Sequence, residues 1–185
     1  MFAVFIDGYH TEMKKDGKVK KVCLYSIAGI DIEGQKQLLG FYVFEGSETK
    51  HFWRQIFEDL INRGLKMIMI IVSDDLPGIG DLIKLLFPKT DHQLCYVHLQ
   101  RNVRRNMKKE DAKDFNSKLK DIKDKGLSFE DALIEADKLF EWYEKKYPSF
   151  IKYLKDKKES YFSFCKYPIE VRKFIYTTKK GRKYP

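Results

Sequence analysis

The fold of this chain is decided by the stretch Met67-Ile-Met-Ile-Ile-Val-Ser73, which is followed at once by Asp74-Asp75-Leu76-Pro77-Gly78. The run at 67–73 is continuously apolar up to its last residue, and Pro77 and Gly78 break the pattern behind it. A short run of this kind is typical of a strand that is covered on both faces, as in a parallel pair. We therefore expect a central parallel strand that ends in carboxylates.

Three further strands are expected upstream, at residues 2–6, 20–31 and 37–45. The Asp16-Gly17 pair between the first two is a strong hairpin signal, and Glu33-Gly34 predicts a second turn. Because turns this short join neighbouring antiparallel strands, the first part of the chain is expected to form a three-stranded meander.

Two helices and a fifth strand complete this region. Ser47 is expected to cap a helix that ends at Gly64, and its apolar residues recur at helical spacing: Phe52, Ile56 and Leu60. A second helix is expected at 79–87 and a fifth strand at 91–97. The order β-β-β-α-β-α-β predicts an α/β fold: a mixed five-stranded sheet with flanking helices, formed by residues 1–98.

The remainder of the chain reads as helical. Helices are expected at 99–109, at 112–125, from a cap at Ser128 to about Tyr147, from Pro148 onward, and at 168–176. We assign residues 99–167 to a helical region and 168–185 to a closing segment with a basic tail.

Composition narrows the function classes. The 185 residues are 43% hydrophobic and 15% aromatic, which is enough for a packed core. No apolar run is long enough to cross a bilayer, and the start lacks the features of a signal peptide. An odd set of three widely spaced cysteines does not suggest a disulfide framework. We expect a cytoplasmic protein without membrane partners, and we exclude collagen, a coiled coil and a secreted mini-protein.

Positive charge is concentrated near the end of the chain. Residues 145–185 carry 13 basic and 3 acidic residues, interleaved with aromatic side chains. Such a segment attracts phosphate backbones, although a solvated basic face over an aromatic core explains it equally well. Arg101, Arg104 and Arg105 fall on nearly one helical face, where they are either phosphate contacts or ordinary solvated side chains.

Asp7 and Asp74 are the candidate catalytic residues. Each ends an expected strand, and in this topology those two strands lie side by side and parallel, so their carboxyl ends meet at one edge. Paired carboxylates are the usual ligands of Mg²⁺ in phosphodiester chemistry. The alternative is that Asp7 only forms a turn before Gly8 and that Asp74 only caps the following helix.

Cys95 and His98 form a lone Cys-x-x-His half-motif. Two ligands do not make a zinc site, and no second pair stands at ligand spacing. A buried cysteine and a histidine that opens a helix explain these residues without a metal. The sequence contains no Walker loop, no dinucleotide-binding glycine fingerprint and no nucleophile elbow.

Several blocks together resemble the Mutator-type insertion-sequence transposases. The blocks are Phe5-Ile-Asp-Gly-Tyr-His10, Leu39-Gly-Phe-Tyr-Val-Phe-Glu-Gly-Ser-Glu48, Val72-Ser-Asp-Asp-Leu-Pro-Gly-Ile79 and Gln93-Leu-Cys-Tyr-Val-His-Leu-Gln-Arg-Asn102. Their spacing also fits, and the resemblance covers residues 2–178.

The resemblance implies an RNase H-like core with a DDE triad and a helical insertion after the fifth strand. It implies Mg²⁺ or Mn²⁺ as cofactor, with Asp7 bridging the ions and Asp74 holding one of them. Cys95 and His98 would shape the site or contact DNA. The implied partners are double-stranded DNA, as element terminal repeats and target, and further copies of the chain in a homo-oligomer. The implied location is the nucleoid.

The chain also departs from that family pattern. The third acid normally follows a Tyr-Thr-Thr block by a few residues, but here Tyr176-Thr177-Thr178 is followed by a basic stretch, and the glutamate is expected near Arg182. A DNA-binding region normally precedes the first aspartate. We therefore expect an incomplete or inactive fragment of a DNA transposase, without the N-terminal DNA-binding region and the third catalytic acid. The alternatives are a non-catalytic DNA-binding remnant and another RNase H-like nuclease, such as a junction resolvase.

Overall fold

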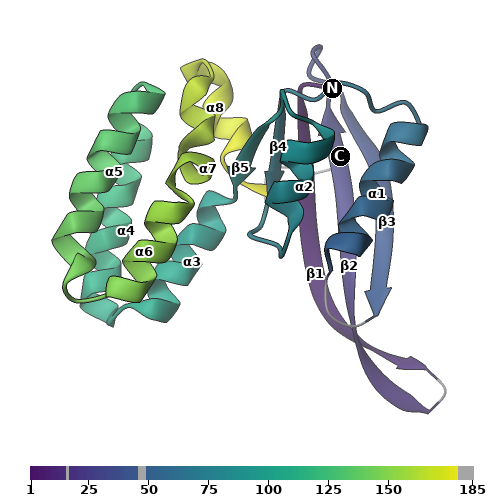
Figure 1. Ribbon diagram of the computed structural model, residues 1–185, viewed down its shortest axis with the longest axis horizontal. Helices are drawn as coiled ribbons and strands as arrows, with labels where there is room; N and C mark the ends of the chain where they lie inside the picture. Colours follow the sequence, from purple (N-terminus) through teal and green to yellow (C-terminus); the bar gives the residue numbers. More distant parts are fainter. Residues whose placement is uncertain (16, 46–48, 179–185) are drawn as a thin grey trace. The chain divides into compact units, whose positions relative to one another are not determined.

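The computed structural model describes residues 1–15, 17–45 and 49–178, which fall into two compact units (Figure 1). The first unit consists of Met1–His92 and the chain from Thr177 onward. The second unit consists of Gln93–Tyr176. Over the described ranges, none of the helices has the length and apolar character needed to cross a membrane.

The first unit is built on a five-stranded sheet in the order β3-β2-β1-β4-β5. The strands are β1 (Ala3–Lys15), β2 (Lys18–Ile30), β3 (Lys36–Glu45), β4 (Ile70–Ser73) and β5 (Asp91–Leu94). β1, β2 and β3 form the expected antiparallel meander, and β4 pairs with β1 in parallel. The predicted α/β class, with its mixed five-stranded sheet and flanking helices, is confirmed and is consistent with an RNase H-like fold.

The first strand is much longer than residues 2–6. Its second half is polar and pairs with β2 as far as Lys15, whose register partner is Lys18 (Figure 1). Beyond the buried Val22 and Cys23, the ribbon is exposed at residues 12–14 and 18–21. Ladder hydrogen bonds hold this outer part together without a buried apolar face, so hydrophobic patterning could not reveal it. Gly17 in the turn has a φ of 74°. The expected turn residue Asp16 lies outside the described residues.

Helices α1 (Lys50–Asn62) and α2 (Ile79–Leu86) follow β3 and β4. The N-cap of α1 is Thr49, whose hydroxyl accepts a hydrogen bond from the Phe52 amide at 3.3 Å. The predicted cap at Ser47 was therefore wrong, and Ser47 itself lies outside the described residues. The predicted end of α1 is confirmed, because Gly64 follows the helix with a φ of 101°.

One face of the sheet packs into the core of the first unit. Tyr25 from β2 meets the Trp53 ring of α1 edge-on, with 4.6 Å between ring centroids, and Ile6 and Ile71 lie in the same cluster. Each fully buried side chain of this size contributes about 1.5–3 kcal/mol relative to exposure. This cluster fixes β1 and β4 against the helices and so holds the ends of both strands in place.

The expected strands at 67–73 and 91–97 are both shorter in the structure. β4 begins only at Ile70, because Met67 and Met69 stand 81% and 53% exposed. β5 ends at Leu94 because a helix already begins at Tyr96. Ile68 is buried in the core although it lies outside the strand, and the continuously buried residues 70–73 form the predicted parallel strand.

The second unit is helical. Its helices are α3 (Tyr96–Asn106), α4 (Lys109–Asp124), α5 (Phe129–Glu144), α6 (Pro148–Asp156), α7 (Lys158–Phe162), the 3-10 turn η1 (Ser163–Lys166) and α8 (Ile169–Ile175). Phe115 of α4 stacks on Phe140 of α5 with 6.1 Å between centroids, and Tyr143 meets the Phe115 ring edge-on. The predicted cap of α5 is confirmed, since the Ser128 hydroxyl accepts from the Asp131 amide.

Candidate active site

Asp7 and Asp74 occupy neighbouring positions just beyond the last parallel pair of β1 and β4. The expectation that Asp7 ends its strand was wrong, because β1 continues to Lys15 through its pairing with β2. Ile6 of β1 and Ser73 of β4 are register partners, and each aspartate is the next residue of its strand or just beyond it. Phe5 and Val72 are partners two positions before the aspartates, so strand alternation assigns both acidic positions to one face of the sheet. Asp7 is only 6% exposed.

Gly8 is required directly behind Asp7. It faces Tyr25 across the β1–β2 ladder, and a Cβ at this position would lie 2.9 Å from Cε1 of that ring. The absent side chain lets the Tyr25 ring fill the core next to the carboxylate-bearing position. Gly8 therefore allows the Tyr25 ring to lie close to β1. It does not form a turn, and β1 continues through it.

Ser73 fixes the backbone at Asp74. Its buried hydroxyl donates to the Asp74 carbonyl at 2.8 Å and lies 2.8 Å from Nε2 of His92. Because the single hydroxyl proton goes to the carbonyl, His92 donates to the serine oxygen through Nε2–H. Sequence reasoning did not single out Ser73, and no spacing signal links it to a histidine on another strand.

Thr178 brings the end of the described chain to Asp7. Its hydroxyl donates to Oδ1 of Asp7 at 3.4 Å, and Thr177 and Thr178 are both buried. The contact joins residues from opposite ends of the chain, so only the Tyr-Thr-Thr block of the family resemblance could have indicated it.

These residues fit a hard divalent cation. Asp7 and Asp74 offer carboxylate oxygens from neighbouring positions of β1 and the residue after β4, and the hydroxyl of Thr178 lies beside Asp7. Mg²⁺ and Mn²⁺ prefer such oxygen ligands and commonly bind through one or two carboxylates. Asp7, Asp74 and the chain from Thr177 all belong to the first unit, so this site lies within one compact body.

The Cys95–His98 half-motif lies in the second unit, at the start of α3. Cys95 is buried at the N-cap position, and its Sγ lies within 4.8 Å of a ring nitrogen of His98. Nη1 of Arg101 lies 2.8 Å from Nε2 of His98. A guanidinium only donates, so Nε2 accepts, and the neutral ring carries its proton on Nδ1. In this arrangement His98 acts as the partner of an arginine.

Arg104 and Arg105 are exposed in the last turn of α3. Arg101 differs from them, because it is partly buried and bonded to His98. The structure therefore separates the three predicted DNA contacts into one inward residue and two outward ones. The two outward guanidinium groups are accessible to a phosphate backbone.

The fold and this geometry define an α/β protein with two acidic residues at neighbouring positions where the parallel pairing of β1 and β4 ends. Comparison with known proteins assigns it to a family. The family described as "Transposase, Mutator family" matches residues 1–181. The chain belongs to the Mutator family of transposases.

Individual relatives agree with that assignment. A probable insertion-sequence transposase of Corynebacterium diphtheriae is 29% identical over 177 residues, covering 95% of this chain and 51% of the relative. A probable ISRM3-like transposase of Sinorhizobium fredii is 30% identical over 180 residues, which cover 95% of this chain and 44% of the relative. The IS905 transposase of Lactococcus lactis is 26% identical over 175 residues, which cover 95% of this chain and 44% of the relative. The chain thus spans about half the length of these curated relatives.

Proposed function

We propose that this chain is the catalytic core of a DNA transposase that cleaves phosphodiesters and transfers strands at element ends with a divalent metal. The observation that carries this proposal is the placement of Asp7 and Asp74 next to each other in register. Family membership supports it, because the relatives are named as transposases of insertion-sequence elements.

Asp7 and Asp74 are the residues that would hold the metal. Bound there, Mg²⁺ or Mn²⁺ would supply activation of the attacking oxygen and stabilisation of the leaving oxygen in an in-line displacement. Asp7 would present its carboxylate from a rigid, buried strand, oriented by the Thr178 hydroxyl. Ser73 would hold the peptide at Asp74, so that the second carboxylate starts from a fixed backbone.

The third acid is the missing part of this site. The resemblance expects it near Arg182, which lies outside the described residues. Asp7 and Asp74 are then two of the three acids that the resemblance implies as metal ligands. We therefore propose that the 185 residues bind metal weakly through two carboxylates and do not cleave DNA by themselves.

The second unit would serve as the helical insertion of the family. Its bounds, Gln93–Tyr176, begin and end several residues away from the expected 99–167. Its exposed Arg104 and Arg105 would contact the phosphate backbone of double-stranded DNA. If metal binding fails, these two arginines favour the alternative that the chain is a non-catalytic DNA-binding protein.

Calorimetric titration of Mn²⁺ into the purified chain tests the proposal. We expect saturable binding that Asp7→Asn and Asp74→Asn each abolish. Asn keeps the size of the side chain and an acceptor oxygen for Thr178, so it removes charge with little change in packing. Asp75→Asn, one residue beyond the site, is the matched control and should bind as the wild type does.

The same titration decides between the two functions. Binding that requires both Asp7 and Asp74 supports the catalytic core. A chain that folds but takes up no Mn²⁺, or one that binds equally well without either carboxylate, overturns the proposal of a metal-dependent enzyme.

A further inference from the structure

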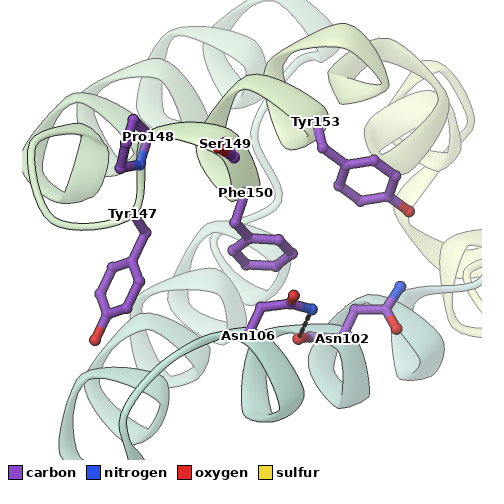
Figure 2. A pocket seen from close by; sticks show the side chains of 7 residues that line it. All are labelled: Asn102, Asn106, Tyr147, Pro148, Ser149, Phe150 and Tyr153. Atoms are coloured by element: carbon purple, nitrogen blue, oxygen red, sulfur yellow. Dashed lines mark hydrogen bonds between the residues drawn. The ribbon is translucent and has the colours of Figure 1, made fainter.

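A pocket in the second unit is not used by the proposed chemistry. It lies between α3 and the start of α6 and has a volume of about 560 Å³, which is within the range of small-molecule sites (Figure 2). Asn102 and Asn106 contribute amides from α3, and Tyr147, Phe150 and Tyr153 contribute rings from the other side. The pocket thus combines flat apolar walls with amide groups.

The amide of Asn102 is available to a ligand. Among the described residues, none forms a hydrogen bond with this side-chain amide. Nδ2 of Asn106 donates to the backbone carbonyl of Asn102 instead, at 2.9 Å. An Asn side chain offers a donor and an acceptor side by side. Figure 2 shows Phe150 directed from α6 toward these two asparagines. A planar ligand on the Phe150 ring would therefore have the amides within reach of its edge.

The aromatic walls are held in place by their own contacts. Phe150 and Tyr153 are nearly parallel, with 15° between their planes and 6.1 Å between centroids. The Tyr153 hydroxyl lies 3.1 Å from that of Tyr161. The Tyr147 hydroxyl donates to Asp111 and accepts from the Lys108 amide. Because these contacts already fix the aromatic side chains, less conformational entropy is lost when a ligand binds.

The pocket also has a basic border. Nζ of Lys157 lies 4.7 Å from the Tyr153 ring centroid, and exposed Arg105 neighbours Asn106 in sequence. Positive charge beside a stacking platform and amides is the combination with which proteins bind single-stranded nucleic acid. An asparagine that recognises a base edge most often pairs with adenine.

We propose that this pocket binds an unpaired base of single-stranded DNA, stacked on Phe150 and hydrogen-bonded to Asn102, with adenine preferred. The proposal rests on the proposed function, because it presumes a DNA substrate. It extends that function by naming a contact for a nucleotide outside the duplex, made by residues of the second unit.

Fluorescence anisotropy with labelled twelve-residue thymine strands tests the pocket. One strand carries a single central adenine, a second carries an abasic site there, and a duplex of the same length is the third probe. EDTA in the buffer removes any contribution of metal at Asp7 and Asp74. We expect the adenine strand to bind more tightly than the abasic one by about tenfold, the order expected for one stacked base.

Variants assign that preference to the pocket. Phe150→Leu keeps an apolar side chain without a ring and should remove most of the preference. Asn102→Ala should reduce the preference for the adenine strand over the abasic strand. It should leave the affinity for the sugar-phosphate backbone unchanged. Trp142→Ala, which removes a 78% exposed aromatic of α5 outside the pocket, is the matched control and should bind as the wild type does. Circular dichroism confirms that each variant is folded.

The outcomes distinguish the pocket from the proposed function. Equal binding of adenine and abasic strands, or an equal loss from Trp142→Ala, overturns the pocket proposal even when the duplex is bound. A folded chain that binds neither strand nor duplex overturns both proposals.

Discussion

Asp7 and Asp74 stand next to each other because Ile6 and Ser73 are register partners in the parallel pair of β1 and β4. The two carboxylates come from distant parts of the sequence, and only the crossover through α1 brings them to one edge. The parallel pairing therefore positions both acids, and any substitution that disturbs β1 next to Asp7 should disturb the site.

Gly8→Ala should destabilise the first unit. The new methyl group would lie 2.9 Å from the fully buried Tyr25 ring, which would have to shift within the core. We expect the free energy of unfolding to fall by about 1–3 kcal/mol, as for other overpacked sites. Urea denaturation measures this loss.

Gly80→Ala is the control for that measurement. A Cβ at Gly80 would lie 3.5 Å from Nδ1 of His92, which is an ordinary contact. Because Gly80 is in helix α2, alanine should leave stability unchanged or raise it by up to about 1 kcal/mol. Equal stability of both variants would contradict the close approach of Gly8 and Tyr25.

Removal of Arg104 and Arg105 should weaken duplex binding without regard to sequence. Each phosphate contact contributes about 0.9 to the slope of log affinity against log salt. We expect the double alanine variant to reduce that slope by about 1–2, measured by anisotropy across a salt series. Arg54→Ala on α1, where the arginine pairs with Glu58, should leave the slope unchanged. A slope unchanged by the double variant would show that this face does not contact DNA.

Arg182→Glu should restore the missing acid. The family pattern expects a glutamate near this position, and Thr178, four residues earlier, already contacts Asp7. We expect nicking of supercoiled DNA in Mn²⁺ to rise at least about tenfold above the wild-type background. Adding Asp74→Asn should return it to background, and nicking that survives this change would come from another source.

Sequence patterns predicted those features that local physical chemistry determines. The apolar run ending at Ser73 predicted a buried parallel strand, and Ser128 predicted a helix cap. The length of β1 was missed, because its polar half is held by ladder bonds to β2 rather than by burial. The Thr49 cap was missed because Ser47 offers the same chemistry two residues away.

Parts of the candidate site were beyond local reasoning. Asp7 and Asp74 could be paired only through an assumed topology, which the structure supplies as a register. The contacts of His92 with Ser73 and of Thr178 with Asp7 join residues far apart in the chain, and no local pattern encodes them. The bond from Arg101 to His98 spans one helical turn, yet both residue types have many other roles.

We propose that Asp7 and Asp74 hold one metal ion together. Thermal unfolding of the wild type, Asp7→Asn, Asp74→Asn and the double variant, each with and without Mn²⁺, tests it most directly. At a hundredfold excess over the dissociation constant, the ion should stabilise the wild type by about 2.7 kcal/mol. A shared ion predicts that either substitution removes this stabilisation and that the second removes nothing further. Partial losses that add up in the double variant would contradict a shared site.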